Sequence, residues 1–110
     1  LNRTQFWFGA GSLNIFSLKC VMYYTYVLYS KTLNKFYIGY SGQLKKRLHD
    51  HFSGTVHTTK RFGDFALIYY EAFVSKYDAQ RREKYFKTTK GKKALRLMLR
   101  ASLQEMKSKV

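Results

Sequence analysis

The chain has 110 residues, and 21 Lys and Arg against 6 Asp and Glu give a formal net charge of +15 at pH 7. A chain of this length builds one hydrophobic core rather than two, and its 45% hydrophobic and 18% aromatic content excludes an intrinsically disordered chain. The excess of cations predicts a polyanionic partner, a nucleic acid before an anionic membrane surface, and binding that weakens as salt rises.

The first 21 residues are expected to form an N-terminal extension that the fold does not need, and residues 22–110 a single domain. Cys20 is the single cysteine. Because one thiol forms neither an internal disulfide nor a cysteine-based zinc cluster, a reducing, cytoplasmic location is favoured. No apolar run in the sequence approaches the ~18 residues of a membrane-spanning helix, so no membrane association is expected.

A β-hairpin is expected at the start of the domain. Aromatic and β-branched residues fill 24–30 and 36–40, and the segment 31–35 between them is short and polar. An amphipathic helix over 43–52 follows, with Ser41 as its expected N-cap. Its apolar residues recur every four positions, at Leu44, Leu48 and Phe52.

The second half of the chain predicts a loop, a strand and two helices. Residues 53–64 show no period and read as a long loop, whereas 66–73 are almost continuously apolar, which predicts a strand that is central or covered on both faces. Ser75 is expected to cap a helix that ends near Lys87, and a final helix is expected over about 90–107. The order ββαβαα predicts the α+β class: a small three-stranded antiparallel sheet flanked by helices.

Several residues in this arrangement are able to do chemistry. Tyr26 and Tyr37 are expected to lie nearly opposite each other across the hairpin. Gly39 permits close approach of another backbone or a ligand, and Arg47 and His51 share one helix face because they are four residues apart. By residue type alone, packing explains the tyrosine pair, and a solvated helix face explains Arg47 and His51.

Glu83 is the most informative acidic residue of the chain. With a helical period of 3.6, Glu83 lies on the same side of its helix as Ala79 and Phe86, beside the buried stripe. The carboxylate is then either paired with a neighbouring arginine or available to Mg²⁺, which commonly takes one or two protein carboxylates and completes its octahedron with water and phosphate. Both readings stay open at this point.

The ordered set of these residues resembles the GIY-YIG endonuclease superfamily, in particular its small stand-alone bacterial members. The set is Tyr24-Thr25-Tyr26, ten intervening residues, Tyr37-Ile38-Gly39, then Arg47, His51 and a glutamate, Glu83, in a later helix. Tyr24 and Thr25 stand where the family name has Gly and Ile. The resemblance covers about residues 23–99.

The resemblance implies a three-stranded antiparallel sheet and metal-dependent hydrolysis of a DNA phosphodiester bond. Tyr26 and Tyr37 match the two motif tyrosines, one of which the family places near the attacking water. Arg47 matches the arginine on the scissile phosphate, Glu83 the carboxylate that holds Mg²⁺ or Mn²⁺, and His51 a histidine that assists proton transfer in some members. We expect Arg47, the metal and the overall positive charge to lower the pKa of the phenol.

Substrate contacts are expected from the glycine of the second motif and from basic residues nearby, although His57 reads more readily as a solvated loop residue. These residues are Gly39, Lys45, Lys46, His57, Lys60 and Arg61. The expected partner is DNA, in repair, recombination or mobile-DNA processing, with RNA left open and no small-molecule cofactor.

Two other classes of protein remain possible from the sequence. Many nucleases of the superfamily carry an asparagine after the glutamate helix, and this chain has no asparagine beyond Asn34. That favours a catalytically weak or inactive nucleic-acid-binding module of the same fold. Charge and aromatic content alone also permit an RNA-binding structural protein.

Overall fold

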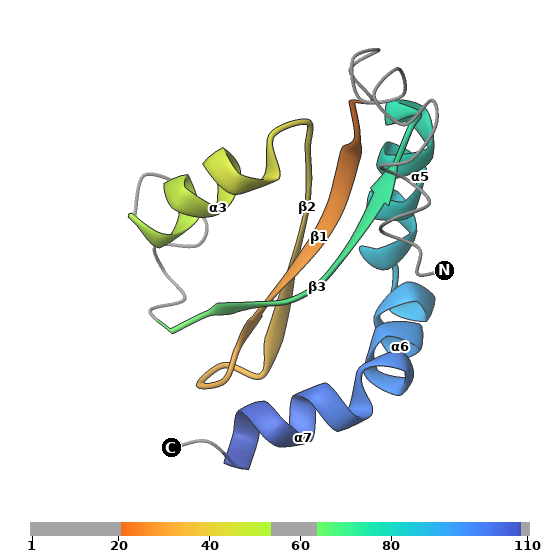
Figure 1. The fold of residues 1–110 in the computed structure, drawn as a ribbon. Coiled ribbons are helices and arrows are strands. Elements are labelled where there is room, and N and C mark those ends of the chain that lie inside the picture. Colours follow the sequence, from red (N-terminus) through yellow and green to blue (C-terminus); the bar gives the residue numbers. More distant parts are fainter. Residues whose placement is uncertain (1–20, 54–63, 109–110) are drawn as a thin grey trace, which may run out of the picture.

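Three antiparallel strands form one sheet in the order β2-β1-β3 in the computed structural model, which describes residues 21–53 and 64–108 (Figure 1). β1 (Tyr23–Ser30) and β2 (Lys35–Ser41) form the predicted hairpin, and β3 (Ala66–Phe73) pairs with the other edge of β1. Asn34 closes the hairpin turn with a φ of 52°, a left-handed conformation that Asn adopts more readily than most residues. The α+β class and the three-stranded antiparallel sheet are confirmed.

The central strand is β1, not β3 as its apolar run suggested. Residues 25–30 are all buried, whereas β3 is an edge strand whose residues are half-buried or exposed. A central strand is hydrogen-bonded to a neighbour along each of its two edges. The apolar residues of a strand do not indicate whether it has one neighbour or two. In β3, that run instead contains aromatic residues such as Tyr70, which is 51% exposed.

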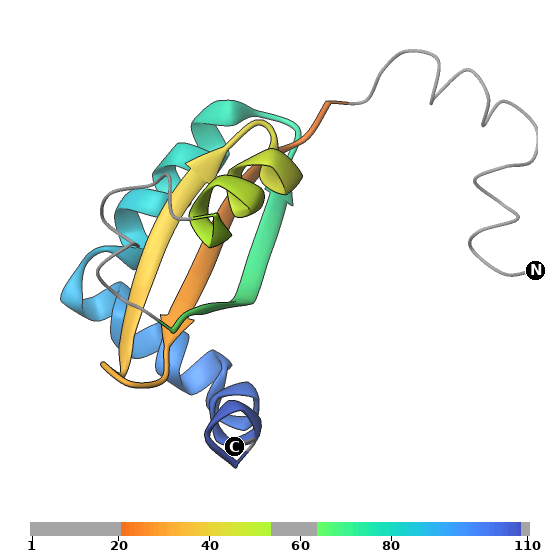
Figure 2. The same ribbon diagram turned by 90° about the vertical axis from the view of Figure 1, so that its left-hand side faces the viewer.

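Helices cover the two faces of the sheet unequally. α3 (Leu44–Phe52) lies on one face, and α5 (Lys76–Phe86), α6 (Thr89–Met98) and α7 (Arg100–Ser108) follow the other (Figures 1 and 2). Because side chains alternate along a strand, β1 sends one set of residues toward α5–α7 and the other set toward α3. The main core lies on the α5–α7 side and consists of Val27, Tyr29, Phe36, Ile38, Phe86, Leu95, Leu99 and Leu103.

Side-chain caps fix where α5 and α6 begin. Ser75 accepts a hydrogen bond from the Tyr77 amide at 3.2 Å, as the sequence predicts. Thr88 caps α6 by accepting from the Gly91 amide at 2.9 Å. The predicted cap of α3, Ser41, bonds to the Gln43 amide at 2.9 Å, one step before the helix, which begins at Leu44.

The single helix predicted over 90–107 is divided into α6 and α7 at Leu99. The Leu99 backbone has φ −107° and ψ 18°, outside the helical region, yet its side chain is buried. The change of direction lets Leu95 and Leu103 reach the same core, and no Gly or Pro marks it in the sequence. None of the helices in the part of the chain described is both long and apolar enough to cross a bilayer.

The proposed boundary between extension and domain falls at the start of the described residues. Residues 1–20 lie outside them. The division into an extension over 1–21 and a domain over 22–110 therefore stays a prediction.

Candidate active site

Tyr26 is the centre of the candidate site, and Gly39 makes room for it. The two residues are cross-strand partners on β1 and β2. A Cβ on Gly39 would lie 2.3 Å from both Cζ and the hydroxyl oxygen of Tyr26. The buried Tyr26 ring thus occupies the space that a side chain at position 39 would fill. The group that approaches Gly39 closely is the Tyr26 side chain, not the backbone or ligand that the sequence suggested. Contact of Gly39 with substrate stays a prediction.

The Tyr26 hydroxyl joins two residues of α3. It lies 2.7 Å from Nε2 of His51, and Nε of Arg47 donates to it at 3.4 Å. Because Arg47 can only donate, the hydroxyl oxygen accepts from Arg47. In the His51 tautomer that accepts at Nε2, the hydroxyl donates its proton to His51, and His51 carries its own proton on Nδ1.

His51 is a neutral imidazole at physiological pH. It is 1% exposed, and burial, assisted by the positive charge of Arg47, lowers its pKa to about 4 despite the opposing effect of Asp50. The ring of Tyr37 meets that of His51 nearly edge-on, with centroids 5.1 Å apart. His51 therefore contacts both motif tyrosines.

The two motif tyrosines are diagonal neighbours rather than direct partners. Tyr37 pairs with Leu28, and Tyr26 with Gly39, so the hairpin register is offset by two residues from the predicted facing pair. Such diagonal neighbours remain within reach of aromatic side chains. The structure thus brings together Tyr26, Tyr37, Arg47 and His51.

Protonation in the site differs from the expectation in one respect. Burial raises the pKa of Tyr26, and the hydrogen bond from Arg47 offsets this only in part. The pKa of Arg47 is raised in turn, chiefly by that same hydrogen bond. In the protein without substrate the phenol is therefore protonated, because removal of water outweighs the nearby cation.

Glu83 acts on the site from the opposite layer of the fold. It belongs to α5, on the other face of the sheet from α3, and its negative charge contributes to the raised pKa of Tyr26. Its side chain is 23% exposed and pairs with Lys87, 56% exposed, at 3.1 Å. The partner is therefore a lysine one turn later, not an arginine.

The carboxylate of Glu83 fits a divalent metal that relies mostly on non-protein ligands. It is half-buried, and one oxygen, Oε2, is engaged by a solvent-exposed lysine, which a cation is able to displace. Within 21–53 and 64–108 there is no group of three or more His, Cys, Asp or Glu that could hold a metal ion. Water and phosphate would complete the coordination, as Mg²⁺ permits.

The predicted substrate-binding residues lie partly within the described chain. Lys45 and Lys46 are exposed on α3, and Lys46 pairs with Asp50 at 3.3 Å. A cavity of about 360 Å³ opens beside Arg47, between the end of β2 and α3. His57, Lys60 and Arg61 lie outside the described residues, so their roles stay predictions.

Sequence reasoning missed two residues near the site. Lys87 pairs with Glu83 at the i, i+4 spacing, glutamate first, which is a recognisable signal. Tyr70 pairs with Tyr26 across β1 and β3 but stays exposed. Nothing in the apolar run of β3 distinguishes that tyrosine from its half-buried neighbours.

Comparisons with known proteins agree with this geometry. Residues 22–96 match the family described as GIY-YIG catalytic domain. The chain is 44% identical over 68 residues to a UPF0213 protein of Limosilactobacillus reuteri (strain DSM 20016), covering 59% of this chain and 70% of the relative. It is 34% identical over 85 residues to a UPF0213 protein of Clostridium perfringens (strain 13 / Type A), covering 76% and 90%. No solved structure matches the chain.

Proposed function

Because the chain belongs to the GIY-YIG catalytic domain family, a nuclease family, we propose that it is a metal-dependent endonuclease that hydrolyses phosphodiester bonds of DNA. Repair, recombination or mobile-DNA processing is the setting we propose. The observation that carries the proposal is the Tyr26 hydroxyl, which contacts both the guanidinium of Arg47 and a buried neutral imidazole. A buried structural tyrosine needs one hydrogen-bond partner, whereas this hydroxyl has a base and a cation beside it.

Tyr26 and His51 form a proton path. The phenol is not a base by itself, because its pKa is raised. At 2.7 Å, however, its proton can pass to Nε2 of His51 while the oxygen takes a proton from an attacking water. A neutral His51 is the state that this transfer requires, and its low pKa preserves that state at physiological pH.

Arg47 has two successive roles in this proposal. Without substrate its guanidinium covers the buried Tyr26 oxygen through a long contact of 3.4 Å, which is weak for a hydrogen bond. When a phosphate occupies the cavity beside α3, the guanidinium turns toward it, because a bidentate contact with phosphate is stronger. This motion neutralises the scissile phosphate and uncovers Tyr26 to water, with the Tyr37 phenol alongside.

Glu83 would hold the divalent metal, which we propose to be Mg²⁺ or Mn²⁺. When bound, the ion supplies positive charge for the phosphate and for the departing oxygen. Lys87 would give up its contact with the carboxylate to the ion, and it balances the charge of Glu83 in the structure described.

The test is cleavage of supercoiled plasmid and of branched DNA, with Mg²⁺ or with EDTA. Wild type is expected to cut only with the metal. Arg47→Ala, Tyr26→Phe and Glu83→Gln are each expected to lower the rate about 10²-fold or more.

Matched controls are available for the two charged positions. Arg81→Ala and Glu105→Gln remove the same charges from exposed positions on α5 and α7 and should keep the wild-type rate. Cleavage that survives both EDTA and Glu83→Gln contradicts the proposed metal ligand. If wild type shifts DNA in a gel but cuts none of it, the protein is instead a binding module of the same fold.

A further inference from the structure

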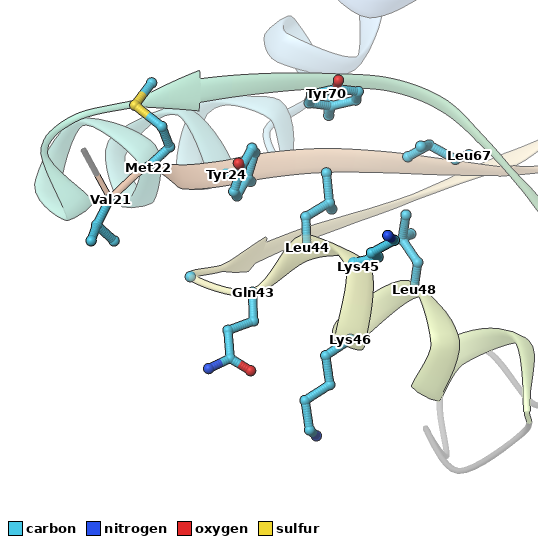
Figure 3. Close-up of a pocket in the computed structure, with 11 residues that line it drawn as sticks. Val21, Met22, Tyr24, Gln43, Leu44, Lys45, Lys46, Leu48, Leu67 and Tyr70 are labelled. Carbon is cyan, nitrogen blue, oxygen red and sulfur yellow. The ribbon is translucent and has the colours of Figure 1, made fainter. Parts of the chain in front are cut away.

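A groove runs along the α3 face of the sheet, between α3, the start of β1 and Tyr70 of β3. It has a volume of about 640 Å³, within the range of sites that bind small organic groups. Figure 3 shows Leu44 pointing from α3 toward the rings of Tyr24 and Tyr70 on the sheet. Val21, Met22, Leu48 and Leu67 add to the apolar part of its wall.

The groove presents aromatic surface that residues 21–53 and 64–108 leave exposed. Tyr70 is 51% exposed although it stands on a strand and faces a helix. Its ring meets Tyr24 edge-on, with centroids 6.0 Å apart, so the pair is fixed in orientation. Aromatic side chains held in this way are the usual platform on which unpaired bases stack.

The groove is continuous with the cavity beside Arg47. Gly42, Gln43 and Lys46 line both, so the two meet around the N-terminal end of α3. The residues that line the groove include Lys45 and Lys46 and no acidic residue. A ligand that is flat, apolar on its faces and joined to phosphate therefore fits this surface better than a neutral or basic peptide.

We propose that this groove binds an unstacked base of the same DNA strand whose phosphate is held by Arg47; the inference rests on the proposed function. A base offers its face to Tyr70 only when it has left the duplex stack. The protein therefore prefers single-stranded or splayed DNA to intact duplex, with Lys45 and Lys46 contacting the phosphates that lead into the groove.

The test is binding in EDTA, where no cleavage occurs, of a labelled single-stranded oligonucleotide and of its blunt duplex. Tyr70→Ala is expected to weaken single-strand binding about tenfold and duplex binding less than twofold, whereas Tyr70→Phe keeps the stacking face and the wild-type affinity. Tyr77→Ala, which removes an exposed tyrosine from α5, should change neither. An equal loss on both DNA forms, or no loss on either, overturns the inference.

A second measurement needs no variant. With a photoreactive 5-iodouracil in the single strand, wild-type protein is expected to crosslink at Tyr70 or Tyr24, and crosslinks only elsewhere contradict the groove. These outcomes are separate from the fate of the nuclease proposal. If single-strand binding depends on Tyr70 but no DNA is cleaved, only the nuclease proposal is contradicted. If DNA is cleaved but binding does not depend on Tyr70, only the proposed base-binding groove is contradicted.

Discussion

At Gly39, one missing methyl group sets the geometry of the whole site. Tyr26 is fully buried and is held at its hydroxyl by His51, so it cannot move away from an intruding atom without breaking that contact. Close packing makes such a position sensitive to even one added carbon. The glycine is needed for its size, and the hydrogen-bonded phenol is what depends on it.

Gly39→Ala is therefore expected to lower the free energy of unfolding by about 1–3 kcal/mol, as overpacking typically does, and to lower cleavage as well. Thermal or urea unfolding measures the first effect. Gly42→Ala is the control, because its Cβ would lie 3.5 Å from the Tyr23 ring, an ordinary contact. Equal stability of the two variants would show that the Tyr26 ring is not confined as described.

His51 predicts a specific dependence of stability on pH. Its pKa is about 4 in the folded protein against 6.5 ordinarily, so the unfolded chain binds the proton first as pH falls. The stability that comes from neutral His51 is complete above pH 6.5 and is lost between pH 6.5 and 4. The loss is about 3 kcal/mol.

Unfolding of wild type and of His51→Gln across this pH range measures the contribution of His51 to the free energy of unfolding. The wild type should lose stability more steeply than the variant as pH falls below 6.5. His49→Gln, which changes an exposed histidine on the same helix, should follow the wild type. A variant curve parallel to that of wild type would mean that His51 titrates normally in the folded protein.

At the level of elements, one cluster of side chains ties β3 to α5. Arg82 donates from Nε and Nη2 to the two carboxylate oxygens of Glu71, both at 2.8 Å, and the Tyr69 hydroxyl donates to the same carboxylate at 2.6 Å. The guanidinium also lies over the Phe86 ring, 4.4 Å from its centroid. The ion pair is half-buried, so it is screened less than a surface pair.

Arg82→Ala is expected to cost about 1–3 kcal/mol, because it leaves Glu71 without its partner and removes packing from Phe86. Its neighbour is a close control: Arg81→Ala removes an exposed i, i+3 pair with Asp78 and should cost less than about 0.5 kcal/mol. Chemical denaturation compares the two. A similar cost for both would show that the contact with Glu71 adds nothing.

The elements also show where reasoning from sequence succeeded and where it did not. Strong local signals, such as the Ser75 cap and the aromatic and β-branched runs of the hairpin, were sufficient for element type, whereas the contact of Tyr26 with His51 was not predicted. The break at Leu99 and the edge position of β3 depend on packing against distant residues, which local sequence does not encode. Glu83 was recognised, but its lysine partner was not.

For the whole molecule, the net charge of +15 predicts binding that falls steeply with salt, and the fold indicates which cations matter. Lys45 and Lys46 stand beside the site on α3, whereas Lys92 and Lys93 are exposed on α6, across the sheet. Only the first pair is near the path of a bound strand. The two pairs carry equal charge, so they form a matched comparison.

Removing both Lys45 and Lys46 by alanine substitution should reduce the slope of log Kobs against log salt by about 2. The double alanine variant of Lys92 and Lys93 should leave that slope nearly unchanged. Anisotropy titrations at several salt concentrations provide the slopes. Equal changes of slope in the two double variants would mean that the positive charge of the protein attracts DNA as a whole and not through contacts of Lys45 and Lys46 at the site.

The position of β1 between two neighbours has a consequence for motion. Its amide groups are bonded on both edges, so their protons should exchange with solvent more slowly than any others in the described chain, and those of α7 much faster. Hydrogen–deuterium exchange by mass spectrometry tests this order, and early exchange in β1 would contradict it. Tyr26 thus stands on the last segment to open. The C-terminal helix α7 can therefore open and close many times while Tyr26, His51 and Gly39 keep their mutual arrangement.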